Sequence, residues 1–127
     1  MSEHDEQAAL IRFCRLIEPR VPDLAWLLHV PNGDLRDARV ARRLKDAGVR
    51  AGVWDLFLPA RRNDQAGIWI EMKTPAGRLS AEQRAFAAHL AQQHCYTLRV
   101  CRSWPEAARA ILDYLGERAE DYGVPGQ

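Results

Sequence analysis

The stretches Gly52-Val-Trp-Asp-Leu-Phe-Leu-Pro59 and Gly67-Ile-Trp-Ile-Glu-Met-Lys73 determine the fold of this chain. Both are rich in β-branched and aromatic residues, and both are bounded by Gly, Pro or a polar loop, which predicts two adjacent strands of one hairpin. Residues two apart in a strand share a face, so Glu71 and Lys73 point to the same side. If Asp55 lies opposite them, two carboxylates and a lysine meet in one pocket.

Charged side chains inside such apolar strands are the exception that points to function. Two neighbouring carboxylates repel each other unless a cation lies between them, and hard divalent ions such as Mg²⁺ or Mn²⁺ prefer an oxygen environment. This arrangement predicts a metal site with a lysine beside it. The alternative is a solvent-exposed cluster of salt bridges on an edge strand, which would contribute at most about 1 kcal/mol.

Length and composition indicate one soluble globular unit. The 127 residues suffice for a single core, with 47% hydrophobic and 28% charged residues. No apolar run approaches the roughly 20 residues of a membrane span, so no membrane partner is expected. We expect one domain over residues 1–116 and a loose C-terminal tail over 117–127, because Gly123, Pro125 and Gly126 crowd its end.

The N-terminus and the cysteines predict a cytoplasmic protein. The opening Met-Ser-Glu-His-Asp-Glu is polar and acidic, unlike the basic and apolar leader of an exported chain. The three cysteines are odd in number and have no C-x-x-C spacing, which argues against a disulfide framework or a zinc site. Thiols in a reducing compartment are the simplest interpretation.

Helical periodicity and capping signals place further elements around the hairpin. Ser80 and Gln83 form a capping-box pattern, and Ser103 precedes a proline in the same way that many helices begin. In the first helix, the core-facing stripe reaches Glu6 or Gln7 and then Glu3, so one carboxylate starts the helix on its buried side. The predicted helices cover Glu3–Ile17, Arg36–Ala47, Ser80 to about His94 and Ser103–Leu115, and further strands cover Trp26–Val30 and Tyr96–Cys101.

A basic segment over residues 36–50 interrupts an otherwise nearly neutral chain. It holds six basic residues against two acidic ones, although the net charge of the whole chain is only +1. Such a segment is either the solvated face of a helix or a contact for a polyanion, and its position before the metal strand favours phosphate binding. The nucleic-acid-binding residues predicted here are Arg36, Arg39, Arg42, Arg43, Lys45 and Arg50.

Several segments together resemble the VRR-NUC (virus-type replication and repair nuclease) family of the PD-(D/E)XK nuclease superfamily. Asp55 followed by Glu71-x-Lys73 is the superfamily pattern, and the match covers most of residues 3 to about 112. The supporting motifs are Glu3-His-Asp-Glu-Gln7, His29-Val-Pro-Asn-Gly33, Leu44-Lys-Asp-Ala-Gly-Val-Arg-Ala-Gly-Val-Trp-Asp55, Ile70-Glu-Met-Lys73 and Gly77-Arg-Leu-Ser-Ala-Glu-Gln83.

This resemblance implies an α/β fold with a restriction-endonuclease-like core, in which helices flank a mixed central β-sheet. It implies a metal-dependent endonuclease that hydrolyses DNA phosphodiester bonds with Mg²⁺ or Mn²⁺ and no organic cofactor. Small stand-alone members from phages and bacteria are linked to cleavage of branched DNA such as Holliday junctions, as homodimers. The expected setting is replication, recombination or repair in a bacterial cell or phage-infected host.

The resemblance also assigns roles to individual residues. Asp55, Glu71 and the backbone carbonyl of Met72 would bind the metal, and Lys73 would hold or help to deprotonate the attacking water. Glu6, or alternatively Glu3, would complete the ligand set. The family places a glutamine near the metal, which suggests a role for Gln83 beyond its capping box. His29 is expected to be structural or simply exposed, not catalytic.

One departure from the family concerns the residue before Asp55. The family usually has Gly-Val-Pro-Asp, whereas this chain has Trp54 in place of the proline. The tryptophan is expected either in the core or, if exposed, stacked on a base. A DNA-binding module with a weakened or inactive nuclease site is therefore the alternative function. A restriction-type enzyme that reads a specific sequence is less favoured, because no extra recognition element is evident.

Overall fold

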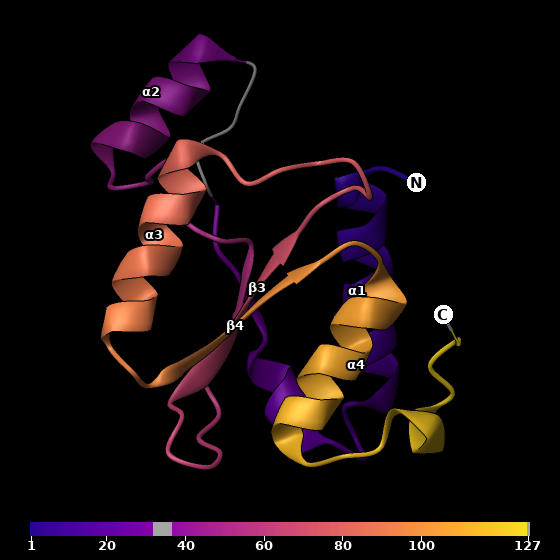
Figure 1. The fold of residues 1–127 in the computed structure, drawn as a ribbon. Helices are drawn as coiled ribbons and strands as arrows, with labels where there is room; N and C mark the ends of the chain where they lie inside the picture. The colour runs from indigo at the N-terminus through magenta and orange to yellow at the C-terminus, as the bar shows by residue number, and fades with distance from the viewer. Residues whose placement is uncertain (32–36, 127) are drawn as a thin grey trace.

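The computed structural model describes residues 1–31 and 37–126, and within them a four-stranded mixed sheet has the order β1-β2-β3-β4 (Figure 1). Neighbouring strands are antiparallel except for β3 and β4, which are parallel. The α/β fold with a mixed central sheet is thus confirmed. The strands are β1 (Leu28–His29), β2 (Leu56–Leu58), β3 (Gly67–Met72) and β4 (Tyr96–Cys101); the helices are α1 (Glu3–Ile17), α2 (Ala38–Asp46), α3 (Ala81–Gln92) and α4 (Trp104–Leu115), with 3-10 helices η1 (Pro22–Trp26) and η2 (Ala119–Tyr122).

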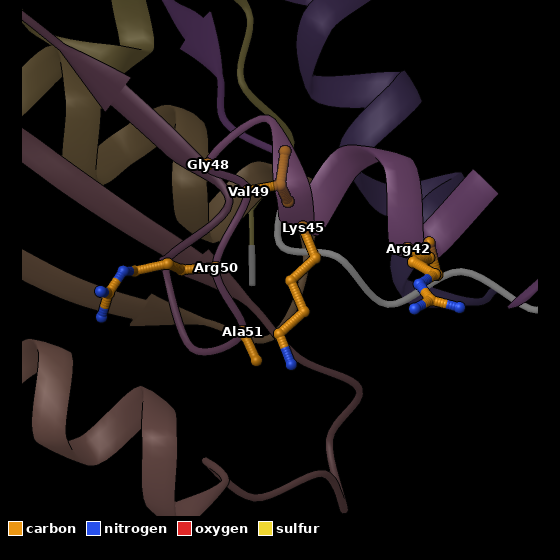
Figure 2. A pocket seen from close by; sticks show the side chains of 7 residues that line it. Arg42, Lys45, Gly48, Val49, Arg50 and Ala51 are labelled. Carbon is orange, nitrogen blue, oxygen red and sulfur yellow. The ribbon is translucent and has the colours of Figure 1, made fainter. Parts of the chain in front are cut away.

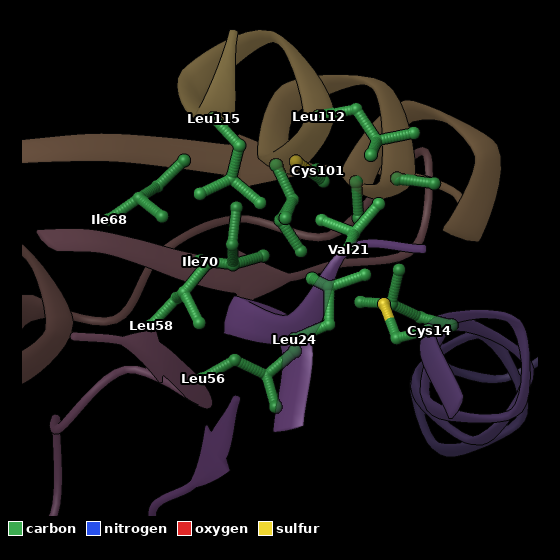
Figure 3. Packing of buried hydrophobic residues seen from close by; sticks show 14 of the residues in the cluster. Cys14, Val21, Leu24, Leu56, Leu58, Ile68, Ile70, Cys101, Leu112 and Leu115 are labelled. Atoms are coloured by element: carbon green, nitrogen blue, oxygen red, sulfur yellow. The ribbon is translucent and has the colours of Figure 1, made fainter. Parts of the chain in front are cut away.

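Helices cover both faces of the sheet. Figure 1 shows α1 and α4 on one side and α3 on the other. Alternate residues of β3 follow this division: Ile68 and Ile70 are buried in the apolar core beneath α1 and α4, whereas Trp69 packs edge-on against Phe86 of α3. Figure 3 shows the core, to which Leu10, Cys14, Leu24, Leu56, Leu58, Met72, Cys101, Ile111 and Leu112 also belong.

The predicted hairpin is present, and its register positions the charged residues. Leu56 pairs with Ile70, and Leu58 pairs with Ile68. Extending this antiparallel register by one residue places Asp55 opposite Glu71, which is the juxtaposition that the sequence predicts.

The helix starts follow local capping chemistry. Ser80 and Gln83 form a capping box at the start of α3, each side chain accepting a hydrogen bond from the backbone of the other. Ser103 caps α4 in a similar way, and this helix ends at Gly116 in the left-handed conformation. These signals are local in sequence, which is why both helix starts are predicted correctly.

Two of the predicted elements differ from the structure. The strand predicted over Trp26–Val30 is reduced to β1, because Pro22 begins a 3-10 helix that extends through Trp26. The second helix begins at Ala38 with Asp37 as its N-cap, and its predicted inward residue Val40 is 42% exposed. Arg36, the predicted start of that helix, lies outside the described residues.

The prediction of a loose tail from residue 117 is wrong for residues 119–124. These residues form η2 and the turn after it, and Ala119 and Val124 are buried in the main core. The guanidinium of Arg20 lies 4.3 Å from the centre of the Tyr122 ring, which ties η2 to the end of α1. Apolar side chains thus outweigh the glycines and the proline of this segment.

None of the helices in residues 1–31 and 37–126 has the length and apolar character that crossing a membrane requires.

Candidate active site

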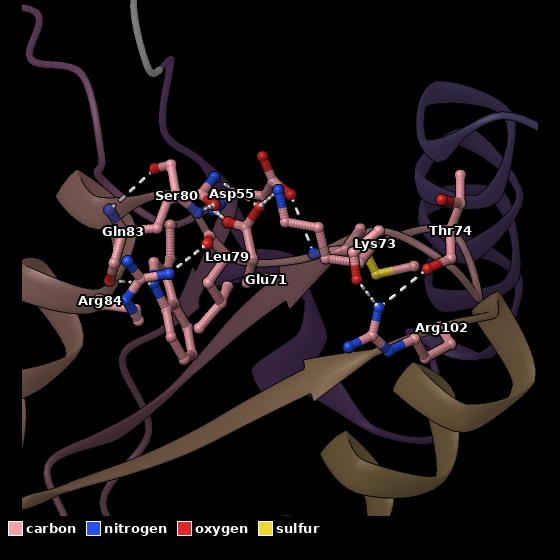
Figure 4. Close-up of polar contacts among 12 residues, drawn as sticks. Asp55, Glu71, Lys73, Thr74, Leu79, Ser80, Gln83, Arg84 and Arg102 are labelled. Carbon is pink, nitrogen blue, oxygen red and sulfur yellow. Dashed lines mark hydrogen bonds and ion pairs between the residues drawn. The ribbon is translucent and has the colours of Figure 1, made fainter.

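Asp55 and Glu71 are held by hydrogen bonds to each other's strands (Figure 4). Asp55 Oδ2 accepts a hydrogen bond of 2.9 Å from the backbone N–H of Met72. Glu71 Oε1 accepts one of 3.1 Å from the backbone N–H of Asp55. Each carboxylate is therefore fixed by the backbone of the facing strand and does not depend on a flexible neighbour for its position.

Lys73 completes the predicted cluster. Its Nζ lies 3.6 Å from Glu71 Oε2, and the two side chains are only 12% and 1% exposed. The alternative of a solvent-exposed salt-bridge cluster on an edge strand is therefore wrong, because β2 and β3 lie inside the sheet and these side chains are largely buried. Burying charges in this way costs free energy unless they are compensated.

The electrostatics of the pair show that its negative charge is incompletely compensated. Burial, reinforced by the charge of Asp55, raises the pKa of Glu71 to about 7, although Lys73 opposes this rise. Burial also raises the pKa of Asp55, against the lowering effect of its hydrogen bond from Met72. A cation bound between the two carboxylates would relieve both effects.

The Gln83 side chain forms the predicted capping box and also contacts the carboxylate pair. Its Oε1 accepts a hydrogen bond from the N–H of Ser80 and completes the capping box, while its Nε2 donates a 2.9 Å hydrogen bond to Glu71 Oε2. The cap and the contact with the site use opposite ends of one amide. Helix α3 therefore delivers a polar side chain directly to the carboxylate pair.

The structure separates the two acidic residues of α1 between which the sequence left a choice. Glu6 Oε2 accepts a 2.7 Å hydrogen bond from the N–H of Trp104, so this carboxylate stabilises the start of α4. The charge of Glu3 instead acts on the carboxylate pair, where it raises the pKa of both Asp55 and Glu71. Glu6 is thus engaged by the start of α4, and the choice between Glu6 and Glu3 as the helix-one carboxylate of the site stays a prediction.

His29 lies against the backbone of the site. Its Nδ1 is 3.0 Å from the carbonyl oxygen of Asp55 and 3.1 Å from Nε2 of Gln7, so one tautomer donates to the carbonyl and the other accepts from the amide. The side chain is exposed and contacts a backbone carbonyl and α1. Its position follows from the pairing of His29 with Leu56, a register that the sequence of β1 alone does not reveal.

Sequence reasoning missed the role of Arg102. This residue follows β4, and its Nη1 donates hydrogen bonds to the carbonyl oxygens of Thr74 and Gly77, at 2.9 Å for Thr74. The guanidinium thereby fixes the loop between Lys73 and α3 (Figure 4). The parallel pairing of β3 with β4 brings the ends of the two strands together, and no local sequence motif predicts this contact of Arg102.

Trp54 is buried, so the alternative that it stacks on a base is wrong. It is 2% exposed, and its indole Nε1 donates a 3.0 Å hydrogen bond to the backbone carbonyl of Gln83. The residue that departs from the family pattern therefore joins the strand before Asp55 to the first turn of α3.

The basic segment forms a hollow of about 780 Å³ a few residues before Asp55 (Figure 2). Arg42, Lys45 and Arg50 line it together with small residues of the turn that follows α2. Arg39 and Arg43 are exposed on α2, which confirms the solvent-facing placement of these side chains. Arg36 lies outside the described residues. The hollow thus presents positive charge on the same stretch of chain that leads into the carboxylate pair.

The oxygen atoms of the carboxylate pair fit a divalent cation whose remaining ligands come from water and the substrate. Within residues 1–31 and 37–126, no three His, Cys, Asp or Glu side chains group closely enough to enclose a metal ion by themselves. Mg²⁺ is usually bound by one or two carboxylates together with water and substrate phosphates, and not by an all-protein cage. Asp55 and Glu71 supply that number of carboxylates, and each retains free lone pairs.

Comparisons with known proteins identify relatives of the chain. The model of the VRR-NUC domain family matches residues 5–105. A solved structure described as a VRR_NUC domain protein superposes with a TM-score of 0.71 at 19% sequence identity, covering 91% of this chain and 89% of the other. This likeness concerns the fold and agrees with a PD-(D/E)XK-like core. No curated protein matches the sequence.

Proposed function

Because the chain belongs to the VRR-NUC domain family, a family of nucleases, we propose that it is a metal-dependent DNA endonuclease that hydrolyses phosphodiester bonds. One observation carries this proposal. Two buried carboxylates, Asp55 and Glu71, face each other on adjacent strands with Lys73 3.6 Å from the second of them. Such a cluster is costly to the fold on its own, which favours a catalytic purpose.

In this proposal, Asp55, Glu71 and the backbone carbonyl of Met72 hold Mg²⁺ or Mn²⁺. The ion would polarise a phosphoryl oxygen, lower the pKa of a water molecule and neutralise charge on the leaving oxygen. The hydrogen bonds that fix both carboxylates against the facing backbones mean that the donors need little rearrangement to bind it.

The protein's own side chains would then act on the water and on the phosphate. Lys73 holds the attacking water; its neutral amine takes up the water's proton, and the resulting ammonium places a positive charge beside the pentacovalent phosphorus. Water adds to phosphorus as the phosphorus–oxygen ester bond breaks, and the leaving oxygen takes a proton from solvent, which leaves a phosphate end and a hydroxyl end. Gln83, through its bond to Glu71, keeps that carboxylate in one orientation during the reaction.

The two α1 carboxylates allow a matched test of their proposed roles. Glu3→Ala is expected to lower cleavage roughly tenfold, because Glu3 assists the metal site from outside its inner ligands. Glu6→Ala is expected to leave cleavage unchanged but to cost about 1–2 kcal/mol of unfolding free energy, because the N–H of Trp104 loses its partner. Cleavage rates and urea unfolding of both variants measure this, and the reverse pattern would restore Glu6 to the site.

The basic hollow is proposed to contact the DNA backbone. Replacing Arg42 and Lys45 by alanine together is expected to weaken DNA binding and to reduce the slope of log affinity against log salt by about 0.9 per lost phosphate contact. The rate of cleavage at saturating DNA should change little, because neither side chain approaches the carboxylate pair. Fluorescence anisotropy over a salt series measures the slope, with Arg12→Ala on the exposed side of α1 as the control. An unchanged slope would contradict the proposed contact.

We propose branched DNA as the preferred substrate and a homodimer as the active form, in the cytoplasm of a bacterial cell or phage-infected host. The support is the resemblance to small stand-alone members and the small footprint of a 127-residue chain, which a dimer would double. Cys14, Cys95 and Cys101 are free thiols, which suits a reducing compartment. Sedimentation equilibrium of the full chain tests the dimer.

The function is tested by incubating labelled four-way junction, flap and plain duplex DNA with the protein in Mg²⁺, Mn²⁺ or EDTA. We expect cleavage of the branched substrates with metal and none in EDTA, with Asp55→Asn as the inactive control. Binding of DNA without cleavage under either metal would support the alternative of a DNA-binding module. Equal cleavage of all three substrates would keep the nuclease and remove its preference for branched DNA.

A further inference from the structure

Four residues around the carboxylate pair form a closed circuit of contacts. Trp54 Nε1 donates to the carbonyl of Gln83 at 3.0 Å, and Gln83 Nε2 donates to Glu71 Oε2 at 2.9 Å. Glu71 Oε1 accepts from the N–H of Asp55 at 3.1 Å, and Asp55 follows Trp54 in the chain. The peptide bond between Trp54 and Asp55 closes the circuit. Asp55, Glu71 and Gln83 already have roles in the proposed metal site, whereas Trp54 has none.

The segment around Trp54 packs tightly against the start of α3. The indole is 2% exposed, so its hydrogen bond is shielded from competing water. Two residues earlier, Gly52 has φ +93°, and a Cβ added there would lie 2.7 Å from the backbone of Glu82. The segment before Asp55 thus lies directly on the first turn of α3, where a side chain at Gly52 would push the two apart.

Few side chains anchor α3 to the rest of the protein, so the contact with Trp54 matters for its first turn. Gln83 and Leu90 are its buried residues, in a helix that the structure describes throughout. Both ends of the Gln83 amide are occupied, Oε1 by the cap and Nε2 by Glu71. A shift of the first turn would therefore be transmitted directly to the carboxylate of Glu71.

We propose that Trp54 is a positioning residue of the metal site: its indole N–H fixes the first turn of α3 so that the Gln83 amide holds the Glu71 carboxylate in its metal-binding orientation. This inference rests on the proposed metal site and deepens it. Trp54 touches neither metal nor DNA in this arrangement, and it acts through Gln83. Outer hydrogen bonds of this kind commonly affect metal affinity strongly.

A double-mutant cycle on the full chain tests the proposal. Mn²⁺ binding without DNA is measured by calorimetry for the native protein, Trp54→Phe, Gln83→Ala and the double variant. Trp54→Phe keeps an aromatic ring but removes the N–H, and it is expected to weaken Mn²⁺ binding roughly tenfold. In the Gln83→Ala background, the same replacement should change Mn²⁺ affinity less than twofold, because the amide through which it acts is gone.

Trp69→Phe is the matched control. Trp69 is a second tryptophan that packs against α3, through Phe86, but within the described residues its Nε1 has no hydrogen-bond partner. This variant should bind Mn²⁺ like the native chain. Amide hydrogen exchange adds a readout independent of metal: the N–H groups of Gln83 and Arg84, which donate to Ser80, should exchange faster in Trp54→Phe and unchanged in Trp69→Phe. This measurement also applies if the Trp54→Phe variant is less stable, because exchange is compared within one folded population.

The outcomes separate this inference from the proposed function. If the native chain binds no Mn²⁺ and Glu71→Gln behaves identically, the metal site and the role of Trp54 both fail. If the native chain binds Mn²⁺ and Trp54→Phe binds equally well, the role of Trp54 alone fails. Equal weakening in both backgrounds would likewise overturn it, because the indole would then act by packing and not through Gln83.

Discussion

Replacing Lys73 by alanine is expected to lower the rate of DNA cleavage roughly 10³- to 10⁴-fold at saturating metal. The physical reason is that the Lys73 side chain is proposed both to take the proton of the attacking water as a neutral amine and to stabilise charge at phosphorus as the resulting ammonium, and each effect alone is worth about 10²-fold or more. Single-turnover cleavage of a labelled four-way junction measures the loss. Mn²⁺ binding and DNA binding should persist, because both carboxylates and the basic hollow remain.

A second replacement separates the two proposed effects of Lys73. Lys73→Arg keeps a positive charge beside Glu71, at a position that is 12% exposed, but a guanidinium does not give up its proton in proteins. Partial recovery relative to Lys73→Ala would show that charge at phosphorus supplies part of the rate. Loss equal to that of alanine would assign the effect to proton transfer. Native-like cleavage by Lys73→Ala would remove Lys73 from the mechanism altogether.

The elements that the sequence predicts well are those with strong local signals. The capping residues Ser80 and Ser103 mark the starts of α3 and α4. A run rich in β-branched and aromatic residues marks β3, and alternation of apolar and polar residues marks β4. Asp55, Glu71 and Lys73 come together as predicted, because a strand has a period of two and a hairpin fixes which residues face each other. Local chemistry and short-range pairing suffice for this part of the site.

The features that the sequence could not decide depend on contacts between distant segments. Glu3 and Glu6 have equivalent positions on the helical stripe, and the N–H of Trp104, 98 residues away, is what engages Glu6. From the sequence alone, Trp54 fits either a core position or an exposed position for base stacking, and the contact with α3 is what decides for the core. Similarly, glycines and a proline favour a loose tail, whereas Ala119 and Val124 are buried by the core that they reach. Long-range packing overrides local propensity in all three cases.

Glu71→Gln is expected to abolish metal-dependent cleavage, with a loss of about 10³-fold or more, and to change how the stability of the metal-free protein depends on pH. Cleavage fails because one of the two carboxylate ligands becomes neutral. For stability, burial followed by the charge of Asp55 raises the pKa of Glu71 from its ordinary 4.5 to about 7 in the folded protein. The unfolded chain releases this proton near pH 4.5, whereas the folded protein keeps it until about pH 7.

The direction in which the unfolding free energy changes with pH follows from this difference in pKa between the folded and unfolded states. Below pH 4.5 both states hold the proton and the group has no effect; between pH 4.5 and 7 the unfolded state is increasingly favoured, and above pH 7 the full penalty remains. We therefore expect the metal-free native protein to lose on the order of 1–3 kcal/mol of unfolding free energy between about pH 5 and pH 8 through this group. Urea unfolding at both pH values measures it, with EDTA present.

Glu71→Gln provides the comparison within that experiment. The amide of the variant has one oxygen for the two donors that Glu71 accepts from, the N–H of Asp55 and Nε2 of Gln83, so one donor loses its acceptor and the variant loses some stability at every pH. That loss cancels when each protein is compared with itself at the two pH values, and the remaining pH dependence should be smaller in the variant. Adding Mg²⁺ should stabilise the native protein most above about pH 7, where Glu71 is charged, and should hardly affect the variant. Identical pH profiles for the two proteins would show that Glu71 does not carry the uncompensated charge.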